Sequence, residues 1–148
     1  MELKSLLVDS KTTWVEFPGL DGFEVELANL SRKELQGIRK NCLNNKFNRK
    51  TRQFEESLDD EKFVREFAQK TVKNWKGLTV EHLSTLMLID TNKASAEEIP
   101  YSVDNAEILV ANSAEFDTWL NEVVFDLENF RDSRERKVPG KAPDPVSK

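Results

Sequence analysis

The residue types that most often catalyse reactions or bind metals are scarce in this sequence. It contains one histidine, His82, and one cysteine, Cys42, so multi-histidine and cysteine-based metal centres are excluded. On a helix His82 and the neighbouring Glu81 would point about 100° apart, and no catalytic motif surrounds them. The five glycines never occur in the spacing of a phosphate-binding loop. We therefore expect no enzymatic activity, no cofactor and no metal site.

The cysteine and two charged clusters each have a chemical and a structural interpretation. Cys42 lies on the core-facing stripe of an expected helix, which favours a buried, inert thiol over a nucleophile. The cluster Asp59, Asp60 and Glu61 could bind a cation, but acidic residues also stabilise a helix N-terminus, and we favour that role. The basic stretch 46–52 could contact nucleic acid. Because the whole chain is acidic, we favour a solvated connector or a protein-contact patch over nucleic-acid binding.

The composition indicates one folded domain. The chain has 148 residues, 33% of them charged, and a formal net charge of −5. Nine phenylalanines, three tryptophans and one tyrosine argue against wholesale disorder. The N-terminal residues lack the pattern of a secretory signal, and no apolar run approaches the roughly 20 residues that span a bilayer. These features predict a soluble protein of a reducing cytoplasm, without a membrane partner.

Hydrophobic periodicity and capping signals predict a mostly α fold with an N-terminal β-hairpin, in the α+β class. Residues 12–28 contain two alternating runs around a Pro-Gly turn, which predicts the hairpin. Ser31 and Glu34 form a capping box for a helix over about 31–43. Residues 44–57 have the composition of a basic connector, partly helical at most.

Further helices are predicted along the rest of residues 1–136, which we interpret as one domain of four to five helices. Their expected bounds are 60–75, with Gly77 as its stop, 79–88, 103–111 and 114–136, and the polar residues 90–98 are expected to form a loop. Residues 137–148 contain three prolines and a glycine, so we expect a disordered tail.

Phe125 stands out on the last predicted helix. It lies almost opposite Phe116 on the helical wheel, outside the main apolar stripe. Such a residue is either buried from a second side or available to a partner or another copy of the chain.

Charges are segregated along the sequence. Residues 31–52 carry eight lysines and arginines and one glutamate, whereas residues 94–130 carry nine acidic residues and no basic one. The two blocks could face each other within the fold or across an oligomer interface, or they could be two solvated faces.

The C-terminal half resembles the tail assembly chaperones of long-tailed, siphovirus-like bacteriophages. The resemblance rests on Trp75-Lys76-Gly77-Leu78 after an aromatic-rich segment, on Ile99-Pro100-Tyr101-Ser102-Val103-Asp104-Asn105-Ala106, and on the aromatic segment from Phe116 to Phe130. It covers roughly residues 14–130. Tyr101 departs from the commoner phenylalanine, and the 21 residues between Gly77 and Ile99 exceed the usual short turn.

The resemblance implies a non-enzymatic role in host cytoplasm during phage assembly. Such chaperones bind the tape measure protein, keep it soluble, help recruit tail tube subunits and are absent from the finished virion. The tube protein is contacted in many relatives through a frameshift-extended form. A structural tail or head–tail joining component is the alternative, and a small regulatory nucleic-acid-binding protein is the second alternative. A homo-oligomer is compatible with each interpretation.

Two sets of residues carry these expectations. Aromatic residues that the core does not need are the candidate partner contacts: Phe125, Tyr101, Phe47 and Phe54. The motif residues that we interpret as structural are Trp75, Gly77, Pro100, Ser102 and Asn105. Among these, Trp75 is expected to anchor a helix end and Ser102 to cap the next helix.

Overall fold

The computed structural model describes residues 1–7 and 11–131, and the predicted tail over 137–148 lies outside them. Among the described residues the fold is mixed α+β, as the sequence predicted, with five α-helices and five β-strands. In chain order the elements are η1 (Leu3–Leu6), β1 (Thr12–Glu16), β2 (Glu24–Ala28), α1 (Arg32–Asn41), β3 (Leu43–Asn48), β4 (Gln53–Leu58), α2 (Asp60–Thr71), β5 (Val72–Lys76), α3 (Val80–Leu86), η2 (Thr91–Lys93), α4 (Val103–Asn112), α5 (Ala114–Val124) and η3 (Leu127–Phe130). No helix among them is long and apolar enough to cross a membrane.

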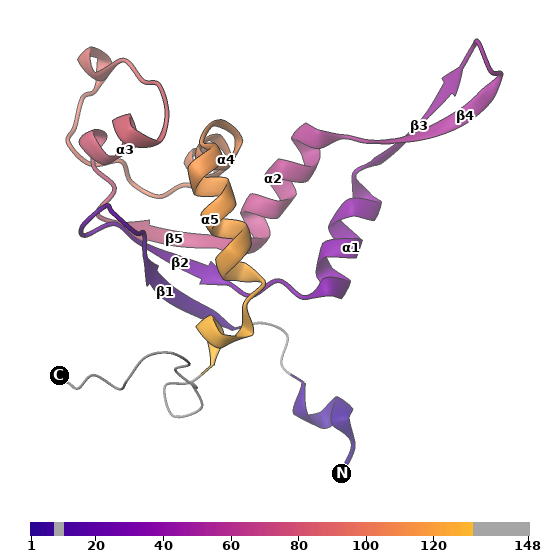
Figure 1. Cartoon of the computed structure of the whole chain (residues 1–148), viewed down its shortest axis with the longest axis horizontal. Coiled ribbons are helices and arrows are strands. Elements are labelled where there is room, and N and C mark those ends of the chain that lie inside the picture. Colours follow the sequence, from indigo (N-terminus) through magenta and orange to yellow (C-terminus); the bar gives the residue numbers. More distant parts are fainter. Residues whose placement is uncertain (8–10, 132–148) are drawn as a thin grey trace.

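The predicted N-terminal hairpin is confirmed and forms two thirds of a small sheet. Strands β1 and β2 pair antiparallel, with Val15 opposite Val25, and β5 pairs antiparallel with the other edge of β2. The alternation along β2 buries Val25 and Leu27 completely. Helices α4 and α5 lie across this sheet (Figure 1). The body of the molecule is therefore a three-stranded sheet with helices packed on it.

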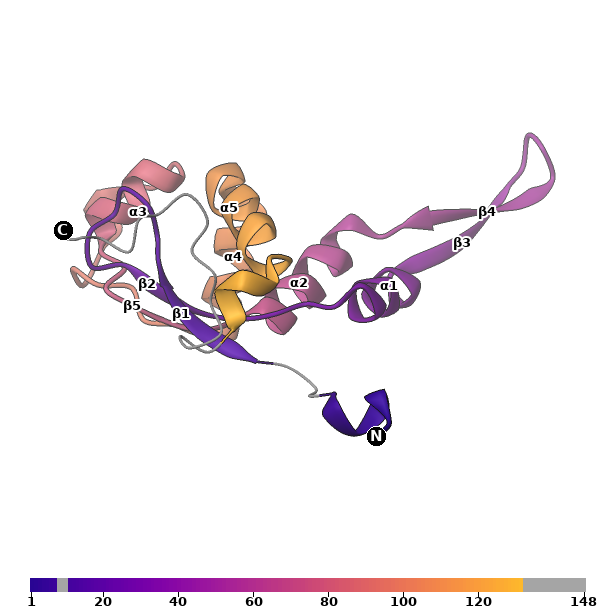
Figure 2. The same ribbon diagram turned by 60° about the horizontal axis from the view of Figure 1, so that its bottom comes forward.

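The second pair of strands corrects the prediction of a basic connector over 44–57. Strands β3 and β4 pair antiparallel from Leu43 opposite Leu58 to Asn48 opposite Gln53. Figures 1 and 2 show this hairpin extending from the ends of α1 and α2, away from the sheet and the remaining helices. We call residues 43–58 the arm.

The helix predicted over 60–75 is only partly correct. It ends at Thr71, and the chain continues directly into β5, where Trp75 pairs with Val25. Trp75 therefore does not anchor a helix end, and Gly77 is not a helix stop. Gly77 follows β5 with φ +78°, and a Cβ there would overlap the carbonyl oxygen of Gly22. Glycine is needed at position 77 because φ is positive there and the Gly22 backbone leaves no room for a Cβ.

The last predicted helix, over 114–136, is also too long. Helix α5 ends at Val124, whose carbonyl accepts hydrogen bonds from the Leu30 amide and the Asn29 side chain. Asp126 then caps the short η3 segment. Phe125 is consequently the C-cap of α5, so its helical-wheel position does not describe its surroundings. The remaining helices lie close to their predicted bounds, and the expected loop over 90–98 contains η2.

An aromatic cluster forms the centre of the core. Phe23 and Phe116 are fully buried and stack with their centroids 6.3 Å apart, and Phe17 lies 4.8 Å from Trp119 in an edge-on contact. Trp75 meets Phe23 edge-on from β5. Aromatic pairs of this kind add about 0.5–1.5 kcal/mol each beyond the area they bury. The motif aromatics thus hold the helices to the sheet.

Cys42 is buried, as predicted, at the junction of α1 and the arm. Burial raises the pKa of its thiol, and the Glu66 carboxylate, which accepts the thiol hydrogen bond at 3.7 Å, raises it further. The thiol titrates at a lower pH in the unfolded chain, so its contribution to stability is lost as pH rises above about 9. We expect iodoacetamide at pH 8 to label Cys42 in urea but not in buffer. Equal labelling rates would contradict this burial.

Candidate functional site

The arm presents one apolar face and one polar face. Residues that alternate along each strand point to the same side. The side called apolar carries two apolar cross-strand pairs, Leu43 with Leu58 and Phe47 with Phe54, and the polar pair Asn45–Glu56 between them. The two phenylalanine rings meet edge-on with centroids 5.4 Å apart. Phe47 is 52% exposed and Phe54 is 75% exposed. Two of the predicted partner contacts are therefore brought together on a surface that the fold leaves uncovered.

The opposite face and the tip of the arm are polar. Lys46 lies across from Glu55, and the Asn48 side chain donates a 2.8 Å hydrogen bond to the Glu55 carboxylate. The four-residue loop at the tip contains Arg49 and Lys50, both exposed, and Arg52 in the left-handed region at φ 56°. The predicted basic stretch is thus the tip of the arm.

Local hydrogen bonds explain why this polar sequence turns where it does. The Asn48 side-chain oxygen accepts from the Lys50 amide at 2.9 Å, and the Arg52 amide donates to the Asn48 carbonyl at 2.7 Å. At the base, the Asp59 amide donates to the Cys42 carbonyl at 2.8 Å, and Asp59 caps α2 by accepting from the Lys62 amide. The acidic cluster therefore serves capping, as expected.

The arm is not covered by the rest of the described structure. An isolated two-stranded hairpin is marginal in water because it has no third strand or helix to cover its apolar face. Every arm residue except Asn48 is exposed, and Asn48 is half-buried. A long, uncovered, two-stranded element with paired apolar side chains is typical of a surface that packs against another molecule.

Phe125, the first predicted contact, lies apart from the arm. It is 39% exposed, and its ring lies 6.3 Å from that of Phe67. Phe67 in turn stacks on Phe63 within α2. Phe125 therefore packs against Phe67 of α2 and remains partly exposed to solvent.

Tyr101 makes contacts inside the fold. Its hydroxyl donates a 3.1 Å hydrogen bond to the Val72 carbonyl, and its ring meets Trp75 edge-on at 5.3 Å. The Trp75 indole N–H donates to the Ile99 carbonyl at 2.9 Å. Downstream, Ser102 caps α4 by accepting from the Asn105 amide at 3.0 Å. These contacts support a structural role for the motif.

Pro100 and Asn105 complete this connection. The Asn105 side chain donates a 3.0 Å hydrogen bond back to the Pro100 carbonyl, so the start of α4 is tied to the segment before it. The segment before Pro100 is joined to the chain just after β5 through the Ile99 amide, which donates to the Leu78 carbonyl at 2.8 Å. The motif residues thus fasten α4 to the sheet.

Removing the Tyr101 hydroxyl tests this structural role. We expect Tyr101→Phe to lower the free energy of unfolding by about 1 kcal/mol, because the Val72 carbonyl loses its hydrogen bond. Burial raises the pKa of Tyr101, so the wild-type chain should lose more stability than the variant as pH rises above about 10. Urea unfolding at pH 7 and pH 10.5 measures both effects. An unchanged midpoint would contradict the assigned contact.

Residues suited to catalysis or metal binding do not converge. No group of three or more metal-ligating side chains occurs within residues 1–7 and 11–131. The His82 ring nitrogen Nδ1 lies 3.1 Å from the Gly77 carbonyl, which is a structural contact of the β5–α3 turn. The arm remains the best candidate site, and its chemistry is that of a binding surface.

The comparisons with known proteins do not add to this assignment. No protein-family model, curated protein or solved structure matches the chain. The case for a function therefore rests on the residues themselves.

Proposed function

We propose that this chain is a bacteriophage tail assembly chaperone that binds the tape measure protein and keeps it soluble. The observation that carries the proposal is the exposed apolar face of the arm, formed by Leu43, Phe47, Phe54 and Leu58. The resemblance of the Trp75 and Pro100 segments to that family supplies the identity of the client.

The chemistry of the arm suits such a client. A tape measure protein is a very long helical chain with apolar stretches that would aggregate if left exposed. An apolar stripe on a client helix can lie along the pairs Leu43–Leu58 and Phe47–Phe54. Burying one phenylalanine ring contributes about 1.5–3 kcal/mol, so the two rings contribute roughly 3–6 kcal/mol before the cost of association, a size that suits weak, reversible binding. Reversibility is required of a chaperone that leaves the finished particle.

The charge of the chain supports the same role. Its net charge of −5 opposes association between complexes, while the tip residues Arg49, Lys50 and Arg52 can pair with acidic residues beside an apolar stripe. The help in recruiting tail tube subunits, through this chain or a longer frameshifted form, is part of the same proposal.

Co-expression tests the proposal. The chain would be produced together with the tape measure protein from the same phage genome, with a tag on the chaperone only. We expect the tape measure protein to move from the pellet to the supernatant and to co-purify. A folded chaperone beside an insoluble, unbound tape measure protein would overturn the proposal.

A second candidate function is favoured by the tip of the arm. Four exposed cations, Lys46, Arg49, Lys50 and Arg52, lie on the same hairpin as two exposed aromatic rings, a combination that can bind single-stranded nucleic acid through charge and stacking. Fluorescence anisotropy with an oligonucleotide, repeated at rising salt, tests it. An affinity for the oligonucleotide that falls steeply with salt and is lost in Arg49→Glu/Lys50→Glu would favour nucleic-acid binding over the chaperone function. Presence of the protein in purified virions would instead favour a structural tail component.

A further inference from the structure

A second uncovered surface lies on the body of the molecule. It is an open hollow of about 410 Å³ between the β1–β2 turn and α5, with a mostly apolar wall. Phe17 and Trp119 form its floor, and Glu115 and Glu122 stand at its rim, both exposed. These two glutamates are the charged residues that line it. The hollow suits an apolar side chain that is flanked by positive charges.

The arm of this chain has that chemistry. Phe54 is the most exposed aromatic side chain of the arm, and the tip loop that precedes it in the chain carries Arg49, Lys50 and Arg52, all exposed. The basic block 31–52 ends in this tip, whereas the acidic block 94–130 contains α4 and α5. Charge and apolar character are therefore complementary between the tip and the hollow.

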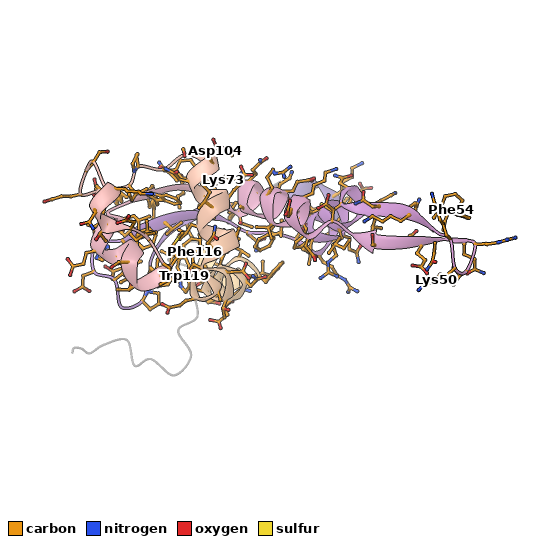
Figure 3. The ribbon with its side chains drawn as sticks, turned by 90° about the horizontal axis from the view of Figure 1, so that it is seen from above. Lys50, Phe54, Lys73, Asp104, Phe116 and Trp119 are labelled. Atoms are coloured by element: carbon orange, nitrogen blue, oxygen red, sulfur yellow. The ribbon has the colours of Figure 1, made fainter. Side chains whose placement is uncertain are left out.

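The tip cannot reach the hollow of its own chain. Figure 3 shows Phe54 and Lys50 at one end of the long axis and Trp119 well away from them, in the body. The salt bridges found within the described part of the chain do not join the basic block to the acidic block. A contact between these surfaces must form between two molecules.

We propose that the arm tip of one copy docks in the hollow of a second copy. Phe54 lies over Phe17 and Trp119, and Arg49 and Lys50 pair with Glu115 and Glu122. Because the two surfaces differ, the contact is heterologous: it closes into a dimer or ring if the rotation permits, and otherwise extends. Such docking covers part of the apolar face of the arm when no client is bound. A client and a second copy would then compete for the arm. This competition rests on the proposed function, whereas the docking itself is independent of it.

Sedimentation velocity on the full chain alone tests the docking. We expect the weight-average sedimentation coefficient to rise with protein concentration. Raising salt from about 0.1 M to about 1 M shortens the Debye length from about 10 Å to about 3 Å, and should weaken the association about tenfold. A monomer at every concentration in low salt would overturn the proposal.

Charge reversal identifies the two surfaces. Arg49→Glu/Lys50→Glu reverses the tip, and Glu115→Lys/Glu122→Lys reverses the hollow. Each variant alone should lose association about tenfold or more, because attraction becomes repulsion. An equimolar mixture should associate again, since the acidic tip of the first variant fits the basic hollow of the second. All four residues are exposed, so we expect both variants to fold, and a thermal melt of each checks this. A mixture that stays monomeric would contradict this pairing.

The same variants separate this docking from client binding. The hollow is not part of the proposed client surface, so Glu115→Lys/Glu122→Lys should still capture the tape measure protein. If that variant loses the client while the wild-type chain shows no self-association, the hollow binds the client and the docking proposal is wrong. If the client is never captured but the mixture restores association, the docking proposal holds and the chaperone proposal fails.

Discussion

Gly77→Ala should destabilise the chain by about 2–5 kcal/mol, the largest effect we expect from a single substitution. Gly77 has φ +78°, a conformation that costs an alanine about 1–2 kcal/mol. Its added Cβ would also overlap the Gly22 carbonyl oxygen, so the β1–β2 turn would have to move away from β5. Urea unfolding followed by tryptophan fluorescence, to which the buried Trp75 and Trp119 contribute, measures the change.

Gly37→Ala is the matched control for this substitution. Gly37 lies in α1, is exposed, and has no atom within 4 Å of the position that a Cβ would take. The same chemical change should therefore raise stability by about 0.5–1 kcal/mol. If both variants have the wild-type midpoint, the close approach of Gly77 to Gly22 is not a feature of the folded chain.

Phe47→Ser/Phe54→Ser should weaken capture of the tape measure protein about 100-fold while leaving the thermal stability of the body nearly unchanged. The two rings together would bury enough apolar surface for at least about 3 kcal/mol of binding. They make no contribution to the buried core, which is formed by other aromatics. Pull-down at graded client concentrations and a thermal melt measure the two properties separately.

The polar face of the arm provides the control. Lys46→Ser/Glu55→Ser removes a cross-strand pair from the same two strands but leaves the apolar face intact. Capture should be close to wild type. If this variant loses the client as completely as the phenylalanine variant, then the stability of the arm, and not its apolar face, determines binding.

Elements specified by nearby residues could be predicted from the sequence. The β1–β2 hairpin follows from two alternating runs around a turn. The starts of α1 and α4 follow from Ser31 and Ser102, whose hydroxyls accept from the amides three residues later. In each case the determining contacts span only a few residues.

Elements that depend on distant partners were missed. Val72 and Trp75 continue the helical spacing of Phe67 and Ala68, so the sequence favours one helix, but pairing with β2 makes them a strand. The end of α5 at Val124 likewise depends on Asn29 and Leu30, about 95 residues earlier. A helical wheel is drawn from one segment alone, so it cannot show either of these long-range contacts.

The arm was missed for a different reason. Asparagine, lysine, glutamine and glutamate dominate its strands, and these residues have low β-propensity. The sequence signal was weak, because Leu43 and Phe47 are four residues apart, as are Phe54 and Leu58. The polar pair Asn45–Glu56 lies between them on the same face, so apolar and polar residues do not alternate. Phe47 and Phe54 were predicted as partner contacts because the core does not need them, but their pairing required the register of the strands.

Photo-crosslinking from the arm tests the central claim most directly. A photoreactive phenylalanine analogue would replace Phe54 in cells that also produce the tape measure protein, and the same analogue at Leu88, a fully exposed body residue, is the reference. We expect irradiation to join the tape measure protein to position 54 and not to position 88. Crosslinks to the tape measure protein from position 88 with none from position 54 would contradict the assignment of the arm as the client-binding surface.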